Sequence, residues 1–326
     1  MRLVRMKVQP PRCRPGILRR QRLLDFLIEH RSQKLILISA PAGYGKTTLV
    51  VDYASAVPHR VCWYLLEETD REPTVFIGYI IETIHRQFPQ FGDQARHALE
   101  AAVHEIDNHL SEQLANVRLS EVIEILLNEL YETVTQDFVL VLNDYHEVES
   151  PRINALMIKL LRYLPGNAQC MILSRDVPML DLPQLAARQE VAGLGVEELR
   201  FTTEEARLFL QQSSHHDLSQ QQTQTLVQRF DGWITGIVLG TKVVTRSLIP
   251  QLADAGDGTS QLFAYLATEV LARQDEDVQR FLVETSVLRC VSASLCDALL
   301  ERQDSRRLLS VVEAKGLFLE RLDNDG

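Results

Sequence analysis

The stretch that decides the fold is LILISAPAGYGKTTLV, residues 35–50. Its apolar start has the length of a buried strand, and its end is typical of a helix start. The loop between them ends in Gly45-Lys46-Thr47 and fits the phosphate-binding loop (P-loop) pattern, except that Ala40 stands where the pattern has its first glycine. That position needs a small side chain more than a positive φ, so alanine is a mild change. The alternative is a glycine-rich turn of an unrelated α/β protein, which the flanking strand and helix disfavour.

Each part of this loop has a physical role in holding a phosphate. Gly43 and Gly45 let the backbone bend so that successive N–H groups face one anion. The helix that opens near Lys46 adds the positive end of its dipole. Lys46 can reach the β- and γ-phosphates, and the Thr47 hydroxyl can ligate Mg²⁺. The residues predicted to bind the phosphates are Pro41, Ala42, Gly43, Tyr44, Gly45, Lys46, Thr47 and Thr48.

Composition limits the class of protein. The chain has 326 residues, which suggests two or three domains, and its five cysteines are scattered, which favours reduced thiols. Apolar runs stay short of the roughly 20 residues of a membrane span, and no secretory signal follows the basic start. We therefore expect a cytoplasmic protein without a membrane partner. The net charge of −10 disfavours a free-standing DNA-binding domain, so DNA contact would need another part of a longer chain.

Residues 1–16 are predicted to form a basic N-terminal arm. Two interpretations stay open: a solvated arm, or arginines that touch the anion held by the P-loop. The basic residues that precede the first acid, Asp25, are Arg2, Arg5, Lys7, Arg12, Arg14, Arg19, Arg20 and Arg22.

Four more apolar runs predict strands, near residues 60–66, 137–142, 170–173 and 190–192. Helical periodicity separates them, so the chain predicts a parallel sheet with right-handed crossovers. The polar segment 92–120 is expected to be helical. After Gly195 helical patterns dominate, at 202–209, 220–230, 234–248, 261–273, 277–285, 294–300 and 306–315. A linker is expected at 254–258 and a possible strand at 317–322. The sequence ends in mid-turn, which suggests a truncated chain.

Nucleotide chemistry needs an acid at the end of a strand beside the P-loop strand. The run Leu140-Val141-Leu142 would deliver Asn143 and Asp144 to the carboxyl edge of the sheet. A helix-capping aspartate is the alternative. Because Asn143 is neutral, Asp144 alone keeps the charge there. We predict that Mg²⁺-assisted binding, with Thr47 and Asp144 as metal ligands, survives while hydrolysis is slow or absent.

Two neighbouring polar residues complete the candidate site. Arg175 follows the fourth strand, where a cation could sense a γ-phosphate. An ordinary surface salt bridge is the alternative. His146 is expected to make local contacts rather than to serve as a base.

These residues also carry a family resemblance. The segment 39–49, Asp144-Tyr145-His146 and Ser174-Arg175 resemble STAND nucleotidases, and most closely the MalT-like, large ATP-binding transcription regulators of the LuxR type. Further segments that resemble this family in matching order are 20–24, 63–70, 199–206, 231–236 and 281–288.

The resemblance implies an α/β fold that begins with a P-loop nucleotide-binding domain at 17–195. This domain would be AAA+/STAND-like, with a parallel sheet. A helical domain at 196–258 and a winged-helix domain at 259–326 would follow. It implies ATP or ADP with Mg²⁺ as ligands, held by Lys46 and Thr47. Asp144 would be the strand-end acid and Arg175 the sensor, while Arg20 and the Gly232-Trp233 region would lie near the nucleotide.

The implied activity is a switch rather than a dedicated enzyme. ADP would hold a closed monomer, and ATP with an inducer would favour self-association. DNA would be bound only through a C-terminal domain that lies outside this sequence. Asn143 departs from the family's paired acids, so we expect at most a slow Mg²⁺-dependent ATPase. The rivals are a P-loop ATPase or kinase with substantial turnover, and a nucleotide-bound scaffold that does not switch.

Overall fold

The computed structural model describes residues 4–11, 17–107, 111–213, 219–238, 271–272, 274–288 and 291–314. By its contacts the chain divides into two units. The first comprises Met1–Ser39 and Gly45–Leu199, and the second comprises Ala40–Tyr44 and Arg200–Gly326. The division therefore passes through the predicted P-loop.

The first unit is built on a five-stranded parallel sheet of order β2-β3-β4-β1-β5. The predicted P-loop strand is β1, in which Leu35, Ile36 and Ile38 are fully buried. Burial of each such side chain contributes about 1.5–3 kcal/mol, which is why an uninterrupted apolar run settles in the centre of a sheet. The strands are β1 (Leu35–Ser39), β2 (Arg60–Leu65), β3 (Phe138–Asn143), β4 (Ala168–Ser174) and β5 (Val191–Leu194).

The strand order corrects one prediction. The strand that ends in Asn143 does not lie beside β1, because β4 is inserted between them. Neighbouring strands are about 4.8 Å apart, so β3 and β1 lie about 10 Å apart. The register nevertheless aligns their carboxyl ends, since Asn143 pairs with Leu173 and Leu173 pairs with Ile38. The residues that follow all three strands thus emerge at the same edge.

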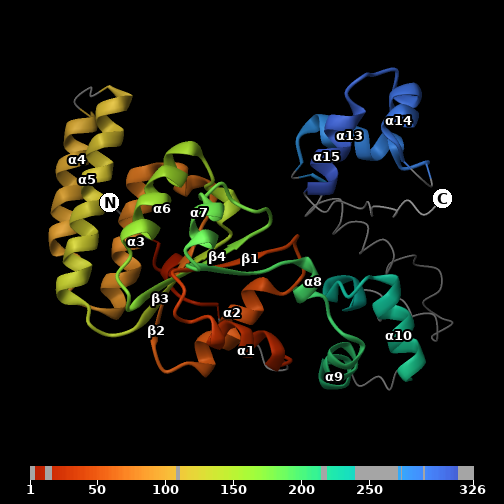
Figure 1. Ribbon diagram of the computed structural model, residues 1–326, viewed down its shortest axis with the longest axis horizontal. Helices are drawn as coiled ribbons and strands as arrows, with labels where there is room; N and C mark the ends of the chain where they lie inside the picture. The colour runs from red at the N-terminus through yellow and green to blue at the C-terminus, as the bar shows by residue number, and fades with distance from the viewer. Residues whose placement is uncertain are drawn as a thin grey trace. The chain divides into compact units, whose positions relative to one another are not determined.

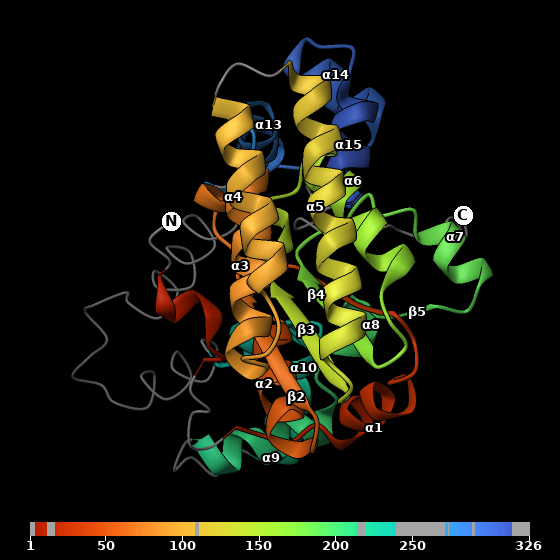
Figure 2. The ribbon, with the colours of Figure 1, turned by 90° about the vertical axis from the view of Figure 1, so that its left-hand side faces the viewer.

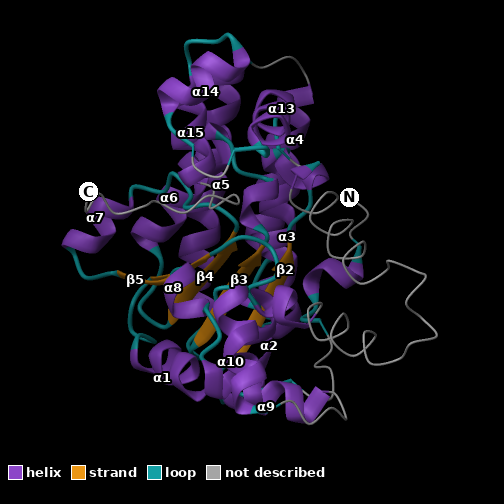
Figure 3. Ribbon diagram, turned by 90° about the vertical axis from the view of Figure 1, so that its right-hand side faces the viewer, coloured by secondary structure: helices purple, strands orange, loops and turns teal. Residues whose placement is uncertain are grey.

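Helices cover both faces of this sheet. Helices α1 (Gln21–Glu29) and α2 (Lys46–Ala56) lie on one face, below the strands in Figure 1, and α3 (Pro73–Gln87) and α6 (Pro151–Tyr163) lie on the other. Figure 3 shows the same layering, with the strands between helices. The remaining elements of this unit are η1 (Arg5–Val8), η2 (Glu68–Arg71), α4 (Asp93–Asp107), α5 (Glu112–Thr133), η3 (Tyr145–Glu147), α7 (Leu182–Ala187) and α8 (Val196–Leu199).

The polar segment 92–120 is helical, as predicted. It contributes α4 and the start of α5, which lie side by side as a long antiparallel pair in Figure 2. The buried Glu129 of α5 fixes the start of α4, because its carboxylate accepts hydrogen bonds from the backbone N–H groups of Gly92, Gln94 and Ala95. A carboxylate at a helix N-terminus satisfies donors that have no partner within the helix.

The basic arm is anchored at one buried lysine. Lys7 is 6% exposed, and its ammonium donates to both carboxylate oxygens of Asp70, at 2.8 and 2.9 Å, and pairs with Glu67 at 2.8 Å. Burial alone would lower the pKa of Lys7, but the hydrogen bonds and charges of Asp70 and Glu67 outweigh it and raise that pKa above 10.5. Neither open interpretation of the arm anticipated this contact.

From Arg200 onward, the described elements of the second unit are helices. Helix α9 (Thr203–Ser213), which lies where a helix was predicted at 202–209, starts with a capping box: Glu205 N–H donates to the Thr202 hydroxyl, and Thr202 N–H donates to the Glu205 carboxylate. Helix α10 (Gln220–Arg229) follows. Helices α13 (Glu276–Thr285), α14 (Ala293–Leu300) and α15 (Ser305–Ala314) share a core formed by Val278, Phe281, Leu282, Cys296, Leu308 and Val312.

Several sequence predictions lie outside the described residues: most of the helices at 234–248 and 261–273, the linker at 254–258, the strand at 317–322, and the chain end. Within the described ranges, every helix is too short or too polar to cross a membrane.

Candidate functional site

The predicted P-loop bends at both of its glycines. Gly43 and Gly45 adopt positive φ angles of 84° and 82°, which an alanine would adopt only with strain. Helix α2 begins at Lys46, directly after Gly45, as predicted. Ala40 is buried and its φ is not positive. Its small size is therefore the property that the first position of the loop needs.

Lys46 is a buried cation. Lys46 is only 7% exposed, and burial lowers the pKa of its ammonium from 10.5 to about 8. The carboxylates of Asp144 and Asp176 raise this pKa, and the cation of Arg175 lowers it further. The structure therefore brings Lys46, Asp144 and Arg175 close enough together for their charges to interact.

A chain of hydrogen bonds joins α2 to the end of β3. The Thr47 hydroxyl donates to Oδ1 of Asn143 over 2.9 Å, and Nδ2 of Asn143 donates to Oδ2 of Asp144 over 2.6 Å. Asn143 is 2% exposed, so its amide orientation is fixed by these two partners. The two candidate metal ligands, Thr47 and Asp144, are thus linked through the neutral side chain that replaces an acid.

Asp144 occupies the N-cap position of η3, in a left-handed conformation with φ 66°, but its side chain makes no capping hydrogen bond to that helix. The capping alternative thus has the position but not the side-chain bond behind it. Aspartate is one of the residues that adopt this conformation most readily, and Asp181 and Asp231 of this chain adopt it as well. His146 pairs locally, with Nε2 at 3.4 Å from Glu147, as expected.

The remaining predicted residues take different positions. Arg175 is half-buried directly after β4, and Thr48 is exposed on the first turn of α2. Arg20 is buried and immediately precedes α1, and its proximity to a nucleotide stays a prediction. No cluster of three histidine, cysteine or acidic side chains that could hold a metal occurs in the described part of the chain.

The second unit contributes two side chains that contact the loop. The indole Nε1 of Trp233 donates to the carbonyl of Ala42 over 3.0 Å, and the hydroxyl of Thr235 donates to the carbonyl of Gly43 over 3.1 Å. All four residues belong to the second unit. Sequence reasoning placed Trp233 near the nucleotide through the family resemblance but gave Thr235 no role. The position of Thr235 two residues after Trp233 was the sequence signal that could have indicated a role for it.

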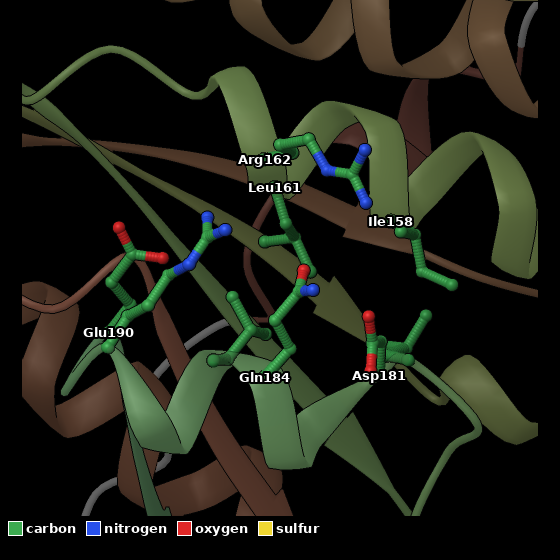
Figure 4. Close-up of a pocket in the computed structure, with 9 residues that line it drawn as sticks. Ile158, Leu161, Arg162, Asp181, Gln184 and Glu190 are labelled. Atoms are coloured by element: carbon green, nitrogen blue, oxygen red, sulfur yellow. The ribbon is translucent and has the colours of Figure 1, made fainter.

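A shallow pocket lies elsewhere in the first unit, between α6 and the segment that carries α7 (Figure 4). Arg162, Asp181 and Glu190 bring charges of both signs to it, beside the apolar Ile158 and Leu161. None of the residues that line it is a predicted site residue. We assign it no function.

Comparison with known proteins gives consistent similarities. Residues 267–326 match the family model described as the MalT winged helix domain. The HTH-type transcriptional regulator MalT of Cronobacter sakazakii is 30% identical over 311 residues, which are 94% of this chain and 33% of that protein. MalT of Serratia proteamaculans is 32% identical over 311 residues, again 94% of this chain and 33% of that protein. The chain spans about a third of the length of these relatives.

Among solved structures, a STAND protein with a tetratricopeptide repeat sensor from Pyrococcus horikoshii matches with a TM-score of 0.48 and 16% identity, over 94% of this chain and 40% of that one. At this level of likeness, the fold is better established by the strand order and the P-loop backbone. These show a P-loop α/β unit, which is followed by a helical segment and a segment that matches the winged-helix family.

Proposed function

Because this chain is MalT-like over 94% of its length, we propose that it is the nucleotide-binding core of a transcription regulator of that type. In this proposal the core binds ADP or ATP and switches between states. DNA binding and inducer recognition belong to the remaining two thirds of such proteins. The two rival functions, an enzyme with brisk turnover and a scaffold that does not switch, differ from it in measurable ways.

The observation that carries the proposal is the buried ammonium of Lys46. Its lowered pKa of about 8 shows that burial opposes its charge, and an anionic ligand would relieve that cost. Lys46 stands at the N-terminus of α2, next to a loop that has positive φ at two glycines. Together these features form a cradle suited to a di- or triphosphate.

The chain's own residues would then have distinct roles. The N–H groups between Pro41 and Thr48 and the Lys46 ammonium hold the phosphates, and Arg175 senses the terminal one. Thr47 and Asp144 supply oxygen ligands for Mg²⁺, which neutralises phosphate charge when it is bound. Adenine is favoured over guanine because the sequence carries no guanine-reading Asn/Thr-Lys-x-Asp motif.

Slow hydrolysis follows from the side chain that stands before Asp144. The amide of Asn143 accepts a hydrogen bond from Thr47 and donates one to Asp144, so it links both candidate metal ligands without adding negative charge. A single carboxylate then has to serve both the metal and the attacking water. Binding without rapid turnover suits a protein whose bound nucleotide defines its state.

A switch also requires that ATP and ADP differ in their contacts with the protein. Only a difference in affinity for two conformations can shift the equilibrium between them. A coupling free energy of about 1–3 kcal/mol would be typical. In this proposal the difference in contacts arises at Arg175, which meets a γ-phosphate in the ATP state and none in the ADP state. The ATP state then self-associates.

The experiment that tests the proposal starts with the nucleotide that co-purifies with the protein, identified by chromatography of the heat-released supernatant. Mass by light scattering and phosphate release are then measured with ADP and with ATP, beside the Lys46→Ala variant. Retained ADP, slow turnover and ATP-dependent assembly support the switch. Brisk turnover favours the enzyme, and one mass in both nucleotides favours the scaffold. The proposal fails if no adenine nucleotide binds, or if Lys46→Ala binds it equally well.

A further inference from the structure

We propose that Trp233 and Thr235 are positioning residues for the phosphate-binding loop, which set the direction of two of its N–H donors by holding two of its carbonyls. This inference rests on the proposed nucleotide binding. It adds two residues of the second unit that would orient the loop for phosphate. The contacts are the hydrogen bonds from Trp233 to Ala42 O and from Thr235 to Gly43 O, at 3.0 and 3.1 Å.

The argument follows from the geometry of a peptide unit. A trans peptide is planar, so the carbonyl of one residue and the N–H of the next point in opposite directions. The carbonyl of Ala42 therefore fixes the direction of the Gly43 N–H, and the carbonyl of Gly43 fixes that of the Tyr44 N–H. A donor that holds the carbonyl from one side leaves the N–H aimed at the other side, where an anion would be bound.

Such a restraint matters most at this position of the loop. Gly43 has a positive φ of 84°, and glycine exchanges between backbone conformations at little cost, so the two peptide planes beside it could rotate. Trp233 and Thr235 fit closely against this residue. A Cβ at Gly43 would collide with the Thr235 hydroxyl and would lie 2.7 Å from Trp233 Nε1. The absence of a side chain is what lets both donors approach.

The segment that presents Trp233 is itself fixed by hydrogen bonds. Gly232 has a positive φ of 68°, its N–H donates to Val227 O at 3.0 Å, and its carbonyl accepts from Phe201 N–H at 2.9 Å. The N–H of Trp233 donates to Phe230 O at 2.8 Å. The adjacent Asp231 forms an ion pair with Arg200. The indole is thus held by a rigid turn, which is the condition for a side chain to orient another group.

This arrangement also gives the second unit a direct influence on phosphate affinity. If the turn moves, the N–H groups of Gly43 and Tyr44 lose their restraint. By linkage, a phosphate that needs those donors stabilises the arrangement in which Trp233 and Thr235 hold the loop.

The test compares Trp233→Phe, which keeps an aromatic ring but removes the donor, with Thr235→Val, which keeps the shape but removes the hydroxyl. Thr235→Ser serves as the rescue variant. Calorimetry of the nucleotide-free chain measures affinity for ADP and for adenosine, which has no phosphate. We expect Trp233→Phe and Thr235→Val each to weaken ADP binding by about fivefold or more, with adenosine affinity unchanged and Thr235→Ser near wild type.

Two outcomes would overturn the inference while leaving the proposed function intact. The first is ADP affinity equal to wild type in both donor-deleting variants. The second is an equal loss of adenosine and ADP affinity, which would place these side chains at the base or in the general fold. Failure of the wild-type chain to bind ADP would instead overturn the proposed function. Thermal unfolding of each variant, matched to wild type, excludes a loss of folding as the cause.

Discussion

The hydroxyl of Thr47 donates a hydrogen bond to Oδ1 of Asn143, 2.9 Å away, although β4 separates β1, which precedes Thr47, from β3, which ends at Asn143. The contact joins the start of α2 to the end of β3 and places a neutral amide where an acid would bring charge. The next residue, Asp144, is therefore the acid that carries charge at this strand end. The chemistry of the site should be sensitive to this one amide.

Asn143→Asp should make nucleotide binding depend more on Mg²⁺ and raise ATP turnover by about tenfold or more. A second carboxylate strengthens the binding of a hard cation, and the cation stabilises charge that develops on the phosphates. Phosphate release with and without Mg²⁺ measures the effect. Asn143→Asp combined with Asp144→Asn is the matched control and should return to slow turnover. Wild-type turnover and metal dependence in Asn143→Asp would show that the amide does not limit hydrolysis.

The affinity for ADP should fall as pH rises above about 8. The pKa of Lys46 is lowered to about 8 in the free protein, chiefly by burial. Phosphate binding favours the charged ammonium, so binding above this pKa requires uptake of a proton and weakens by up to about tenfold per pH unit. Below it, the ammonium is already charged and this group adds no pH dependence.

Calorimetric titration with ADP from about pH 7 to 10 checks this prediction. Lys46→Arg is the control, because a guanidinium stays charged over that whole range. Its ADP affinity, whatever its absolute value, should not show the decline. If the wild-type and Lys46→Arg proteins lose affinity in parallel, then a different group is responsible.

The buried pair of Lys7 and Asp70 should stabilise the first unit strongly. The side chain of Lys7 is 7% exposed and that of Asp70 is 2% exposed, so Asp70→Asn leaves an ammonium buried with one fewer charge partner. Because Glu67 remains beside Lys7, the charge is not left alone, and we expect a cost of about 1.5–3 kcal/mol, typical of lost hydrogen bonds to a charged group. Because the pKa of Lys7 is raised above 10.5, its contribution persists from neutral pH up to that value and is lost only as pH rises beyond it.

Urea unfolding of Asp70→Asn at neutral pH measures this cost. The control is Glu121→Gln, which breaks the ion pair between Arg118 and Glu121, both about half exposed, and should cost less than about 1 kcal/mol. Equal losses in the two variants would show that the arm is not held by its buried lysine.

Much of the first unit could be predicted from the sequence because its signals are local. The apolar run at 35–38 predicts β1, and the glycines that follow it predict the turn. The order of the strands is not a local property. The prediction that β3 lies beside β1 was wrong because the run at 170–173 is inserted between them, and sequence order does not reveal this.

The contacts of Lys7 and Thr235 were missed for a related reason. Lys7 meets Asp70 and Thr235 meets Gly43 across long separations in sequence, and each partner is identified only by the folded chain. The contact of Thr235 is also made to a backbone carbonyl, which every residue has. Residue type at the partner position therefore gives no signal. The hints are the nearby Trp233 and the glycine that leaves room for the hydroxyl.

The two loop glycines provide a matched pair for a final prediction. Both adopt positive φ, so alanine at either position costs about 1–2 kcal/mol of backbone strain. They differ in their surroundings. A Cβ at Gly45 has no heavy atom within 4 Å, whereas a Cβ at Gly43 lies 2.7 Å from Trp233 Nε1. Gly43→Ala carries an additional steric cost of about 1–3 kcal/mol that Gly45→Ala does not.

Gly43→Ala should therefore lower the free energy of unfolding more than Gly45→Ala does, when both are measured by chemical denaturation without nucleotide. Thr235→Ala, introduced into the Gly43→Ala background, removes the hydroxyl that the new methyl group meets and should recover part of the difference. The same Thr235→Ala change in the Gly45→Ala background should recover none, because no contact is relieved there. Equal destabilisation by the two glycine variants would mean that the loop moves away from Trp233 and Thr235 at little cost, and the close approach of these side chains would then have no energetic consequence.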